Sequence, residues 1–383
     1  MNIVFFSDSY RPYVSGVVRS IENYSCFLRK RGHRVYIFAP DYAGVDANEK
    51  NVFRFKSLPA VIYPSFRISL PFSLRILDKL KELKADVIHS HSPFLMGRLS
   101  LWAADKLIIP HVFTYHTLYE QYTHYFPGIS GLLSYLISRY VKNYCSRSNL
   151  IITPSKFVKK KIDEKGISSP VSVVPTGINL EEYKKDSELD IRKKYDIGEK
   201  ENIILSVGRL GKEKNIDFLL KVINKLSRSG KKVRMLIVGE GPQKENLKKM
   251  SEKLKLGEIV IFAGGCAPEE VFNYYKEADL LVFSSCSETQ GLVLLEAMAA
   301  GLPVVAVDAG GVSTVVENGK NGFLLDRDID SFAKVIKKVF ANRKLYELVS
   351  KGARKTVEKY SMEKMVDIML GHYRDIINGR DNP

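Results

Sequence analysis

The sequence predicts an α/β protein with two doubly wound, Rossmann-like domains. Its 383 residues exceed what one compact core usually holds, because domains average roughly 150 residues. Short apolar runs, many of them rich in β-branched residues, alternate with longer amphipathic stretches. This alternation is typical of parallel sheets that helices cover on both faces. Half of the runs precede residue 180 and half follow residue 200, which indicates two sheets.

The expected strands form two sets in chain order. The first set comprises Asn2–Ser7, Arg34–Ala39, Val87–Ser90, His111–Tyr115, Leu150–Thr153 and Val171–Val174. The second set comprises Asn202–Val207, Lys232–Val238, Ile259–Phe262, Leu280–Ser284, Pro303–Val307 and Gly322–Leu325. Residues 129–144 and 361–377 instead repeat apolar side chains at the spacing of amphipathic helices.

A charged segment without a strand, residues 181–202, separates the two sets. We expect it to be a linker with a short solvated helix, between a first domain of residues 1–180 and a second of residues 200–360. Residues 361–383 then form a C-terminal helix that can cross back to the first domain. Ligands of doubly wound sheets bind beyond the carboxyl ends of the strands, so we expect the two domains to face each other across a cleft.

Charge and cysteine content limit the classes of protein and of binding partner that the sequence allows. The net charge is +16, and residues 1–180 carry 24 Lys and Arg against 12 Asp and Glu. Such a basic half attracts nucleic acid, acidic lipid head groups or phosphorylated substrates, although a lysine-rich chain can also simply be soluble. The four cysteines form no CxxC pair, which disfavours a zinc site or a disulfide framework. We expect reduced, mostly buried thiols in a cytoplasmic protein.

The sequence predicts neither a signal peptide nor a membrane span. The N-terminal residues have the pattern of a β-strand and lack a basic leader. The most apolar stretch, Leu292–Val307, contains Glu296 and Pro303. It therefore falls short of the ~20 apolar residues that a spanning helix needs.

The strongest chemical signal is the segment SETQGLVLLEAMAAGLPVVAV, residues 287–307. A strand and a polar loop precede Gly291, which opens a helix whose free N–H groups suit a phosphate or sugar hydroxyls. Glu288 lies in the loop and Glu296 on the helix, and a carboxylate can accept two hydrogen bonds from neighbouring sugar hydroxyls. Glu296 stands among apolar residues, where an unpaired carboxylate is costly, so a binding role is favoured over a solvated surface glutamate.

Two further loops follow predicted strands. In SVGRLGKEKN, residues 206–215, the planar fork of Arg209 and the point charge of Lys214 together suit a diphosphate. In VGEGP, residues 238–242, the glycines permit close approach of the backbone. This loop is not a GxGxxG fingerprint, so the sequence does not favour hydride transfer with a dinucleotide.

Together these motifs resemble glycosyltransferase family 4, a family of retaining enzymes with the GT-B fold. The resemblance covers nearly the whole chain, and it includes TPS at residues 153–155 and PTGIN at residues 175–179. It implies that residues 1–180 bind the acceptor and residues 200–360 bind a nucleotide sugar. Gln290 departs from the phenylalanine usual in the family, and SETQGL and residues 114–125 are similar to members that act on membrane diacylglycerol.

The resemblance also implies roles for single residues. Arg209 and Lys214 would hold the donor diphosphate, Glu296 the ribose and Glu288 the donor sugar. The implied catalytic residues are His116, Arg209, Lys214 and Glu288. The implied donor-binding residues are Gly16, Gly208, Arg209, Lys214, Gly239, Ala263, Gly264, Glu288, Gln290, Gly291, Leu292 and Glu296.

The acceptor half offers aromatic and basic candidates. His116 follows a strand and would contact the transferred sugar by resemblance, whereas a purely structural histidine is the alternative. The apolar face of residues 129–144, and the mixed apolar and basic residues 66–84, suit an anionic bilayer surface or, equally, core packing. The candidates for acceptor or membrane contact are Tyr119, Tyr122, His124, Arg139, Lys142, Lys159 and Lys160.

The resulting hypothesis is transfer of glucose from UDP-glucose to diacylglycerol, with retention, by a peripheral protein at the cytoplasmic membrane face. No cofactor or metal is expected, since Asp326, Asp328 and Asp330 suit a turn and an N-cap. The alternatives are another donor, such as GDP-mannose or UDP-GlcNAc, a soluble or phosphatidylinositol-type acceptor, and a sugar-nucleotide epimerase. A nucleic-acid binder is disfavoured because basic and aromatic residues do not interleave in a surface motif.

Overall fold

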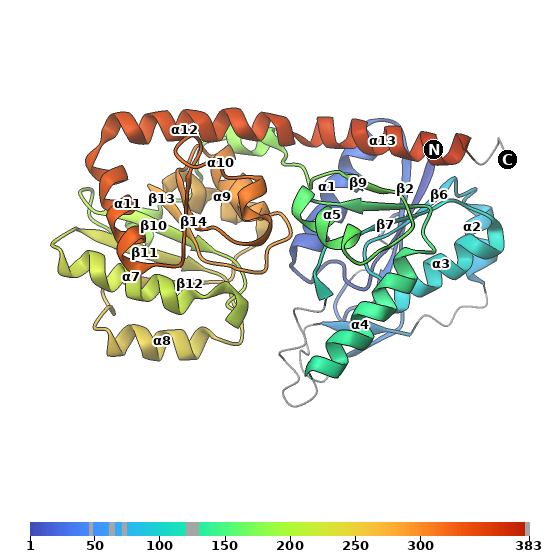
Figure 1. Ribbon diagram of the computed structural model, residues 1–383, viewed down its shortest axis with the longest axis horizontal. Helices are drawn as coiled ribbons and strands as arrows, with labels where there is room; N and C mark the ends of the chain where they lie inside the picture. The colour runs from blue at the N-terminus through green and yellow to red at the C-terminus, as the bar shows by residue number, and fades with distance from the viewer. Residues whose placement is uncertain (46–48, 61–65, 71–74, 120–129, 380–383) are drawn as a thin grey trace. The chain divides into compact units, whose positions relative to one another are not determined.

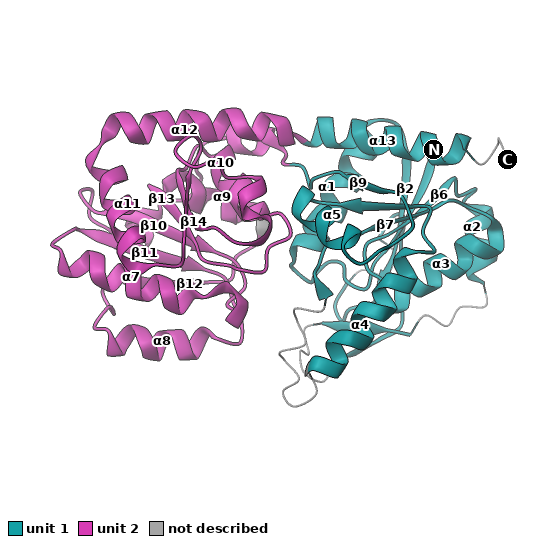
Figure 2. Cartoon of the chain, viewed as in Figure 1, with its two compact units in different colours: residues 1–177, 362–383 teal, residues 178–361 magenta. Residues whose placement is uncertain are grey.

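A computed structural model describes the chain except for residues 46–48, 61–65, 71–74, 120–129 and 380–383. The chain forms two compact units (Figure 2). Unit 1 comprises Met1–Gly177 and Met362–Pro383, and unit 2 comprises Ile178–Ser361. Each unit contains a parallel sheet with helices on both faces (Figure 1), which confirms the predicted fold class.

The sheet of unit 1 has seven described strands in the order β3-β2-β1-β6-β7-β8-β9, all parallel. The strands are β1 (Asn2–Phe6), β2 (Arg34–Pro40), β3 (Val52–Phe55), β6 (Val87–Ser90), β7 (His111–Thr114), β8 (Leu150–Thr153) and β9 (Val171–Val173). The helices are α1 (Gly16–Lys30), α2 (Ile76–Glu82), α3 (Leu95–Leu107), α4 (Ser130–Cys145), α5 (Lys156–Asp163) and α13 (Met362–Asn378). Alternate residues of β1 serve opposite faces: Ile3 and Phe5 pack with α1 and α13, whereas Val4 and Phe6 pack with α2 and α3.

The sheet of unit 2 has the order β12-β11-β10-β13-β14-β15 and is also parallel. Its strands are β10 (Asn202–Val207), β11 (Val233–Val238), β12 (Val260–Gly264), β13 (Leu280–Phe283), β14 (Val304–Val307) and β15 (Phe323–Leu325). One face carries α7 (Ile216–Arg228), α8 (Lys244–Lys253) and α11 (Ile329–Ala341). The other face carries α9 (Pro268–Glu277), α10 (Leu292–Ala299) and α12 (Arg343–Val357).

All twelve predicted strands are present, with ends that differ by at most two residues. In the part of the chain that the structure describes, three further strands were not predicted: β3, β4 (Ser57–Pro59) and β5 (Arg67–Ser69). Arg54 interrupts the apolar run of β3, and β4 and β5 form an antiparallel pair of only three residues each. Arg67 stabilises this short pair, because its Nη2 atom donates a 2.6 Å hydrogen bond to the carbonyl of Ser57.

The charged segment between the two strand sets contains the predicted short helix but is not a linker, which corrects that part of the prediction. Residues 181–202 belong to unit 2 and include most of the 3-10 turn η2 (Leu180–Lys184) and the short helix α6 (Ile191–Lys194). Tyr183, Ile191 and Ile197 are buried in the core of this unit. These few apolar side chains fix the segment, although the residues around them are mostly charged.

The prediction of mostly buried thiols is also wrong. All four cysteines are free, but only Cys145 is buried. Cys266 is half-buried, and Cys26 and Cys286 are exposed. In addition, no helix of the described residues combines the length and the apolar character that crossing a bilayer requires.

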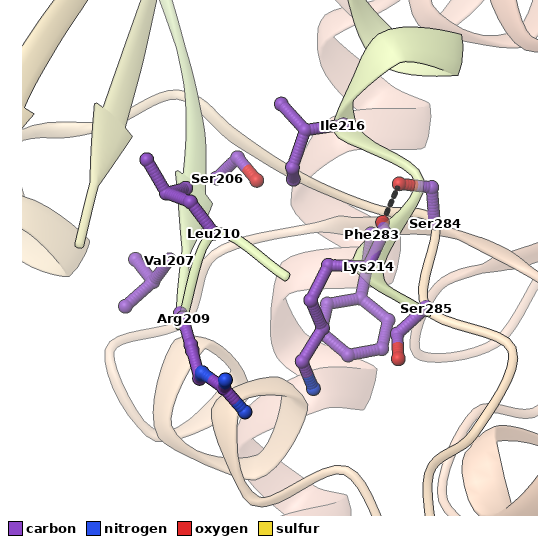
Figure 3. Close-up of a pocket in the computed structure, with 10 residues that line it drawn as sticks. Ser206, Val207, Arg209, Leu210, Lys214, Ile216, Phe283, Ser284 and Ser285 are labelled. Carbon is purple, nitrogen blue, oxygen red and sulfur yellow. Dashed lines mark hydrogen bonds between the residues drawn. The ribbon is translucent and has the colours of Figure 1, made fainter. Parts of the chain in front are cut away.

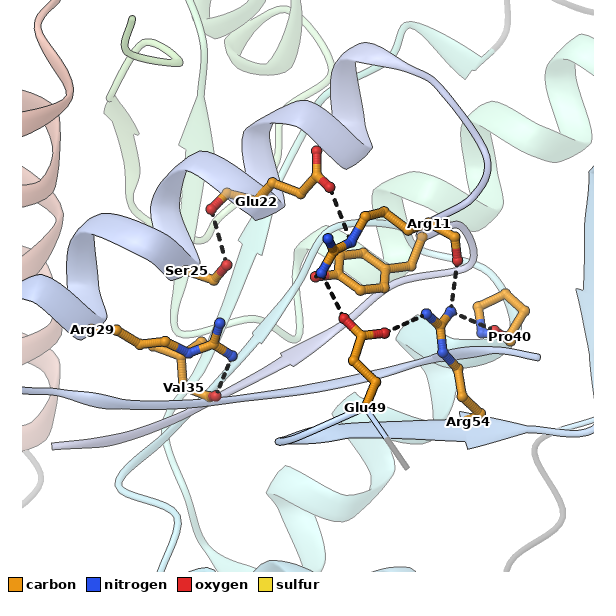
Figure 4. Close-up of polar contacts among 9 residues, drawn as sticks. Arg11, Glu22, Ser25, Arg29, Val35, Pro40, Glu49 and Arg54 are labelled. Carbon is orange, nitrogen blue, oxygen red and sulfur yellow. Dashed lines mark hydrogen bonds and ion pairs between the residues drawn. The ribbon is translucent and has the colours of Figure 1, made fainter. Parts of the chain in front are cut away.

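A network of ion pairs fixes the loop between β1 and α1 in unit 1 (Figure 4). Arg11 lies 3.1 Å from the Glu22 carboxylate and 2.6 Å from that of Glu49. Arg54 lies 2.9 Å from the second oxygen of Glu49 and donates another hydrogen bond of 2.9 Å to the carbonyl of Arg11. The side chain of Arg54 is only 5% exposed, so this network is shielded from solvent on one side. It holds the chain that leads to Gly16.

Candidate active site

A pocket lies at the carboxyl ends of β10 and β13 in unit 2 (Figure 3). These neighbouring strands mark the position where the strand order reverses, since β11 lies on the other side of β10. Doubly wound sheets bind ligands at this position. The lining residues are Ser206, Val207, Gly208, Arg209, Leu210, Lys214, Ile216, Phe283, Ser284 and Ser285. The cationic ends of Arg209 and Lys214 extend to the same side of the pocket (Figure 3).

The loop that carries Arg209 is locked against the loop after β11. Gly208 has a φ of +140° and donates a 3.0 Å hydrogen bond to the carbonyl of Val238. A Cβ atom on Gly239 would lie 2.0 Å from the carbonyl oxygen of Gly208. The predicted close approach at VGEGP is therefore between two segments of the protein. Only glycine fits there, and the packing sets the position of Arg209.

Lys214 is the last residue of the 3-10 turn η3 (Lys212–Lys214) and is held at both ends. Its carbonyl accepts a 2.6 Å hydrogen bond from the Ser284 hydroxyl, shown as a dashed line in Figure 3. Its ammonium group forms an ion pair with Glu288 Oε1. The structure thus places Arg209 and Lys214 in the lining of one pocket and joins Lys214 to Glu288 by an ion pair.

The environment of Glu288 keeps this side chain ionised. Its side chain is 17% exposed, and burial acts to raise its pKa. The charge and hydrogen bond of Lys214 outweigh burial and lower the pKa of Glu288. A carboxylate held in this way can accept hydrogen bonds from sugar hydroxyls.

The loop from Glu288 to Gly291 packs against Gly310 and Gly311, which follow β14. Gly311 donates a 2.7 Å hydrogen bond from its N–H to the carbonyl of Glu288. A Cβ on Gly311 would lie 2.2 Å from the carbonyl oxygen of Thr289, and a Cβ on Gly310 would lie 2.7 Å from that of Glu288. Sequence reasoning missed this pair. Only glycine allows the loop to lie so close.

Gly291 opens α10 as predicted. Its φ of +86° lies in the left-handed region, which favours glycine. Leu292 is the first residue of the helix, whose first turn leaves N–H groups without partners in the helix. The preceding Gln290 is 3% exposed.

Glu296 lies on α10 and is half-buried. Tyr275, near the end of α9, donates a 2.9 Å hydrogen bond from its hydroxyl to Glu296 Oε2. Tyr275 is 1% exposed, and its burial and the charge of Glu296 raise the pKa of its hydroxyl. Tyr275 therefore remains a donor, and Glu296 has the pairing that its apolar surroundings require.

The backbone positions expected near the nucleotide base lie at the end of β12. Ala263 and Gly264 are the last two residues of this strand and are half-buried. The carbonyl of Gly264 accepts a 2.8 Å hydrogen bond from the N–H of Gly239. Like Glu296 and Gln290, these residues do not line the pocket between β10 and β13.

In unit 1, polar residues gather where β1 and β6 end, next to the position where the strand order of this sheet reverses. Asp8 accepts hydrogen bonds of 2.5 Å from the Ser92 hydroxyl and 2.9 Å from the N–H of Met96. Burial raises the pKa of Asp8 in spite of these donors. His91, immediately before Ser92, is 1% exposed and lies 3.0 Å from His116, measured from Nδ1 to Nε2.

His116 is the one predicted catalytic residue in unit 1. It follows β7, and burial lowers its pKa to about 3. Gly16, predicted to bind the donor, is the first residue of α1 and is exposed. The N-cap of this helix is Ser15, whose hydroxyl accepts a 3.3 Å hydrogen bond from the N–H of Val18.

Of the acceptor candidates Tyr119, Tyr122 and His124, the structure describes only Tyr119. Tyr115 is fully buried and packs on Tyr119 with ring centroids 5.7 Å apart. Tyr115 is therefore a core residue, and Tyr119 lies partly buried beside it. Tyr122 and His124 lie outside the described residues.

The predicted apolar stripe of α4 does not face one environment. Val141, Tyr144 and Cys145 are buried, whereas Leu132 is 66% exposed and Leu136 is 51% exposed. The C-terminal half of α4 thus packs on the sheet, and the N-terminal half presents apolar side chains to solvent. Among the basic candidates, Arg139, Lys142 and Lys160 are exposed, and Lys159 donates a 2.7 Å hydrogen bond to the carbonyl of Val171.

Asp328 has the predicted N-cap role. It precedes α11 and accepts a 2.8 Å hydrogen bond from the N–H of Ser331. Within the described residues, no three His, Cys, Asp or Glu side chains gather where they could hold a metal ion.

Two family models match consecutive parts of the chain. Glycosyltransferase Family 4 matches residues 14–182, and Glycosyl transferases group 1 matches residues 187–356. An alpha-monoglucosyldiacylglycerol synthase of Streptococcus pneumoniae is 30% identical over 96% of this chain and 86% of its own length. Another, from Acholeplasma laidlawii, is 31% identical over 99% of this chain and 98% of its own length. The chain belongs to glycosyltransferase family 4.

Solved structures assign the same fold to this glycosyltransferase. HepE from Anabaena, crystallised with UDP and glucose, has a TM-score of 0.79 at 18% identity and covers 97% of this chain and 99% of its own. Sucrose-phosphate synthase from Thermosynechococcus elongatus has a TM-score of 0.77 at 20% identity and covers 98% and 99%. The glycosyltransferase therefore has the GT-B fold, with two Rossmann-like domains.

In each unit, some polar residues next to the predicted site residues were not predicted from the sequence. Tyr275 occurs in an amphipathic helix, where an aromatic residue looks like core. Asp8, His91 and Ser92 directly follow predicted strands, which is the signal that identified His116 in the glycosyltransferase. Applying that rule to every strand end would have found all three.

Proposed function

We propose that this glycosyltransferase transfers glucose from UDP-glucose to diacylglycerol at the cytoplasmic face of a membrane, with retention of the anomeric configuration. The observation that carries the proposal is the full-length similarity, at 30% and 31% identity, to two proteins named alpha-monoglucosyldiacylglycerol synthase. A third relative, the sulfoquinovosyl transferase SQD2 of Arabidopsis thaliana, is 31% identical over 93% of this chain and 70% of its own length.

In this proposal the pocket of unit 2 receives the donor diphosphate. An ammonium group has three N–H donors, so Lys214 can keep its ion pair with Glu288 and also bind a phosphate oxygen. Arg209, on the same side of the pocket, adds a planar pair of donors. Both cations stabilise the negative charge that grows on the leaving diphosphate, as does the N-terminus of α10.

The remaining donor contacts follow the family assignment. Glu296 binds the ribose hydroxyls, and Glu288 binds the sugar. The backbone around Ala263 and Gly264 holds the base. In unit 1, Gly16 binds the donor and His116 contacts the transferred sugar.

The proposed reaction exchanges one C–O bond for another on the same face of the sugar. The bond between the anomeric carbon and the UDP oxygen breaks, and a bond to the diacylglycerol hydroxyl oxygen forms. The hydroxyl proton moves to the departing phosphate oxygen. This route needs no covalent nucleophile from the protein and no metal ion.

We assign membrane contact to two exposed apolar groups of unit 1. On α4, Leu132, Tyr135 and Leu136 are 66%, 61% and 51% exposed, and exposed Arg139 and Lys142 follow them. On the β4–β5 pair, Leu58 and Ile68 lie directly opposite each other and are 58% and 41% exposed. Apolar side chains beside cations suit an interface with anionic lipid.

Other donors and acceptors remain alternatives within the family. Relatives named GDP-mannose-dependent alpha-mannosyltransferase are 26% and 28% identical over nearly the whole chain. These identities are lower than those of the two alpha-monoglucosyldiacylglycerol synthases. UDP-GlcNAc as donor, and a soluble or phosphatidylinositol-type acceptor, are further alternatives. A sugar-nucleotide epimerase would convert the nucleotide sugar without any acceptor.

A product assay distinguishes these functions. Radiolabelled UDP-glucose, UDP-GlcNAc and GDP-mannose are each incubated with the protein and with vesicles that contain diacylglycerol, phosphatidylinositol or neither. We expect a labelled lipid only with UDP-glucose and diacylglycerol, and NMR of the product should show the α anomer. Label in a phosphatidylinositol product, transfer from another donor, or conversion of the nucleotide sugar without lipid would overturn the proposal.

A further inference from the structure

Three imidazole rings form a stack at the carboxyl edge of the unit 1 sheet. The ring centroids of His89 and His91 are 4.4 Å apart and those of His91 and His116 are 5.3 Å apart, with interplanar angles of 23° and 24°. His89 is anchored on both sides, with Tyr373 Oη 2.5 Å from Nδ1 and Thr114 Oγ1 2.7 Å from Nε2. His91 and His116 instead contact each other, since His91 Nδ1 lies 3.0 Å from His116 Nε2.

The contact between His91 and His116 requires one ring to donate and the other to accept. Burial lowers the pKa of His91 to well below its ordinary value and that of His116 to about 3. Both rings are therefore neutral near pH 7, and each carries one N–H. The position of the shared proton then fixes which nitrogen of each ring is protonated.

The surroundings of His91 decide the direction of this hydrogen bond. His91 Nε2 is buried and has no hydrogen-bond partner among the described residues. If His116 donated, the proton of His91 would lie on Nε2 as a buried N–H without an acceptor among the described residues, and buried side-chain donors without a partner are rare. If His91 donates from Nδ1, its Nε2 carries only a lone pair. The second arrangement is favoured.

We propose that His91 is a positioning residue that donates from Nδ1 to His116 Nε2 and thereby fixes the proton of His116 on Nδ1. His116 then presents a hydrogen-bond donor at Nδ1, and neither of its nitrogens is available as a general base. The inference rests on the proposed function in one respect, namely that His116 contacts the transferred sugar. With the proton on Nδ1, the ring donates to a sugar oxygen and cannot remove a proton from a sugar hydroxyl.

Three substitutions of His91 separate this role from simple packing. The side-chain nitrogen of asparagine can lie close to the position of Nδ1, so His91→Asn can still donate to His116. His91→Asp offers only an acceptor there, and His91→Leu offers neither. Nitrogen-15 NMR of histidine-labelled protein reports which ring nitrogen is protonated, and a His116→Gln spectrum assigns the signal.

We expect the proton of His116 on Nδ1 in the unmodified protein and in His91→Asn, and on Nε2 in His91→Asp. We also expect kcat of His91→Asn to exceed that of His91→Leu by about tenfold, the effect of losing roughly 1.4 kcal/mol of stabilisation. A packing role alone would favour leucine, which fills the space better. Thermal unfolding of each variant shows whether it is folded before its kinetics are compared.

The inference is overturned if His116 carries its proton on Nε2 in the unmodified protein. It is equally overturned if folded His91→Asn and His91→Leu have the same kcat. The NMR result does not depend on which sugar or acceptor is used. Failure of the glucosyl-transfer assay with a proton on Nδ1 would therefore remove the proposed function and leave the assignment of the hydrogen bond intact.

Discussion

Tyr275 and Glu296 form a 2.9 Å hydrogen bond that joins α9 to α10 in unit 2. We expect Glu296→Ala to weaken UDP binding by about 10- to 100-fold, because hydrogen bonds to a charged group contribute about 1.5–3 kcal/mol. Tyr275→Phe should have a smaller effect, since the carboxylate is retained. Isothermal titration with UDP measures both affinities.

Glu317→Ala is a matched control for this experiment. Glu317 also lies in unit 2, but its side chain is 52% exposed and pairs with the exposed Lys320. We expect it to bind UDP as the unmodified protein does. Unchanged UDP affinity in a folded Glu296→Ala variant would contradict the assignment of Glu296 to the ribose.

The Tyr275–Glu296 bond also illustrates what the sequence can and cannot predict. Glu288 and Glu296 occur in one local motif, and the strand, loop and helix around them follow from hydrophobic pattern and a glycine. Tyr275 reaches Glu296 only through the packing of α9 on α10, and nothing in its own segment marks it. Likewise, Gly311 follows the next strand, β14, and its N–H bonds to the carbonyl of Glu288. Such contacts are set by tertiary structure, which periodicity does not contain.

The Lys214–Glu288 pair makes a second prediction. Lys214→Ala leaves Glu288 partly buried without its cation, so the pKa of Glu288 should rise, and the donor diphosphate loses one charge contact. We expect kcat/KM for the nucleotide sugar to fall by at least about 100-fold, typical of losing a group that stabilises developing negative charge. Initial rates over a range of donor concentrations measure this.

Lys212→Ala is the control for Lys214→Ala. Lys212 belongs to the same 3-10 turn but is exposed and does not line the pocket. The assignment of Lys214 would be contradicted if the two variants lost activity to the same extent.

Metal-independent chemistry is a third prediction. The proposed route neutralises the diphosphate with Arg209, Lys214 and the N-terminus of α10, so we expect full activity in excess EDTA after dialysis. Adding Mg²⁺ or Mn²⁺ should not increase kcat. Abolition of activity by the chelator, with recovery on adding one of these metals, would show that a cation is required.

The exposed half of α4 makes a fourth prediction. We expect the double change Leu132→Ser and Leu136→Ser to weaken sedimentation with phosphatidylglycerol-containing liposomes by at least about tenfold, since burying one leucine contributes about 1.5–3 kcal/mol. Leu348→Ser is the matched control, because Leu348 is 61% exposed but lies on α12 of unit 2. Equal losses in both variants, or binding that ignores the anionic lipid content, would argue against membrane contact through α4.

Buried neutral histidines make the stability of unit 1 sensitive to acid. Burial lowers the pKa of His111 to about 3, whereas a histidine in the unfolded chain titrates at about 6.5. Below about pH 6.5 the His111 ring binds a proton in the unfolded chain but stays neutral in the folded protein. The free energy of unfolding is therefore not reduced by His111 above this pH. As the pH falls towards 3, it decreases by about 1.4 kcal/mol per pH unit for each such histidine.

His111→Asn should reduce the pH dependence of the free energy of unfolding by the contribution of one histidine. The single tryptophan of the sequence, Trp102 on α3, reports unfolding of unit 1 by fluorescence in urea. Ser100→Ala is the control, because it removes a hydroxyl 3.1 Å from His111 Nε2 but retains the ring. We expect its pH slope between about 6 and 4 to match that of the unmodified protein. If His111→Asn has that same slope, the ring of His111 is already protonated in the folded protein and is not held neutral by burial.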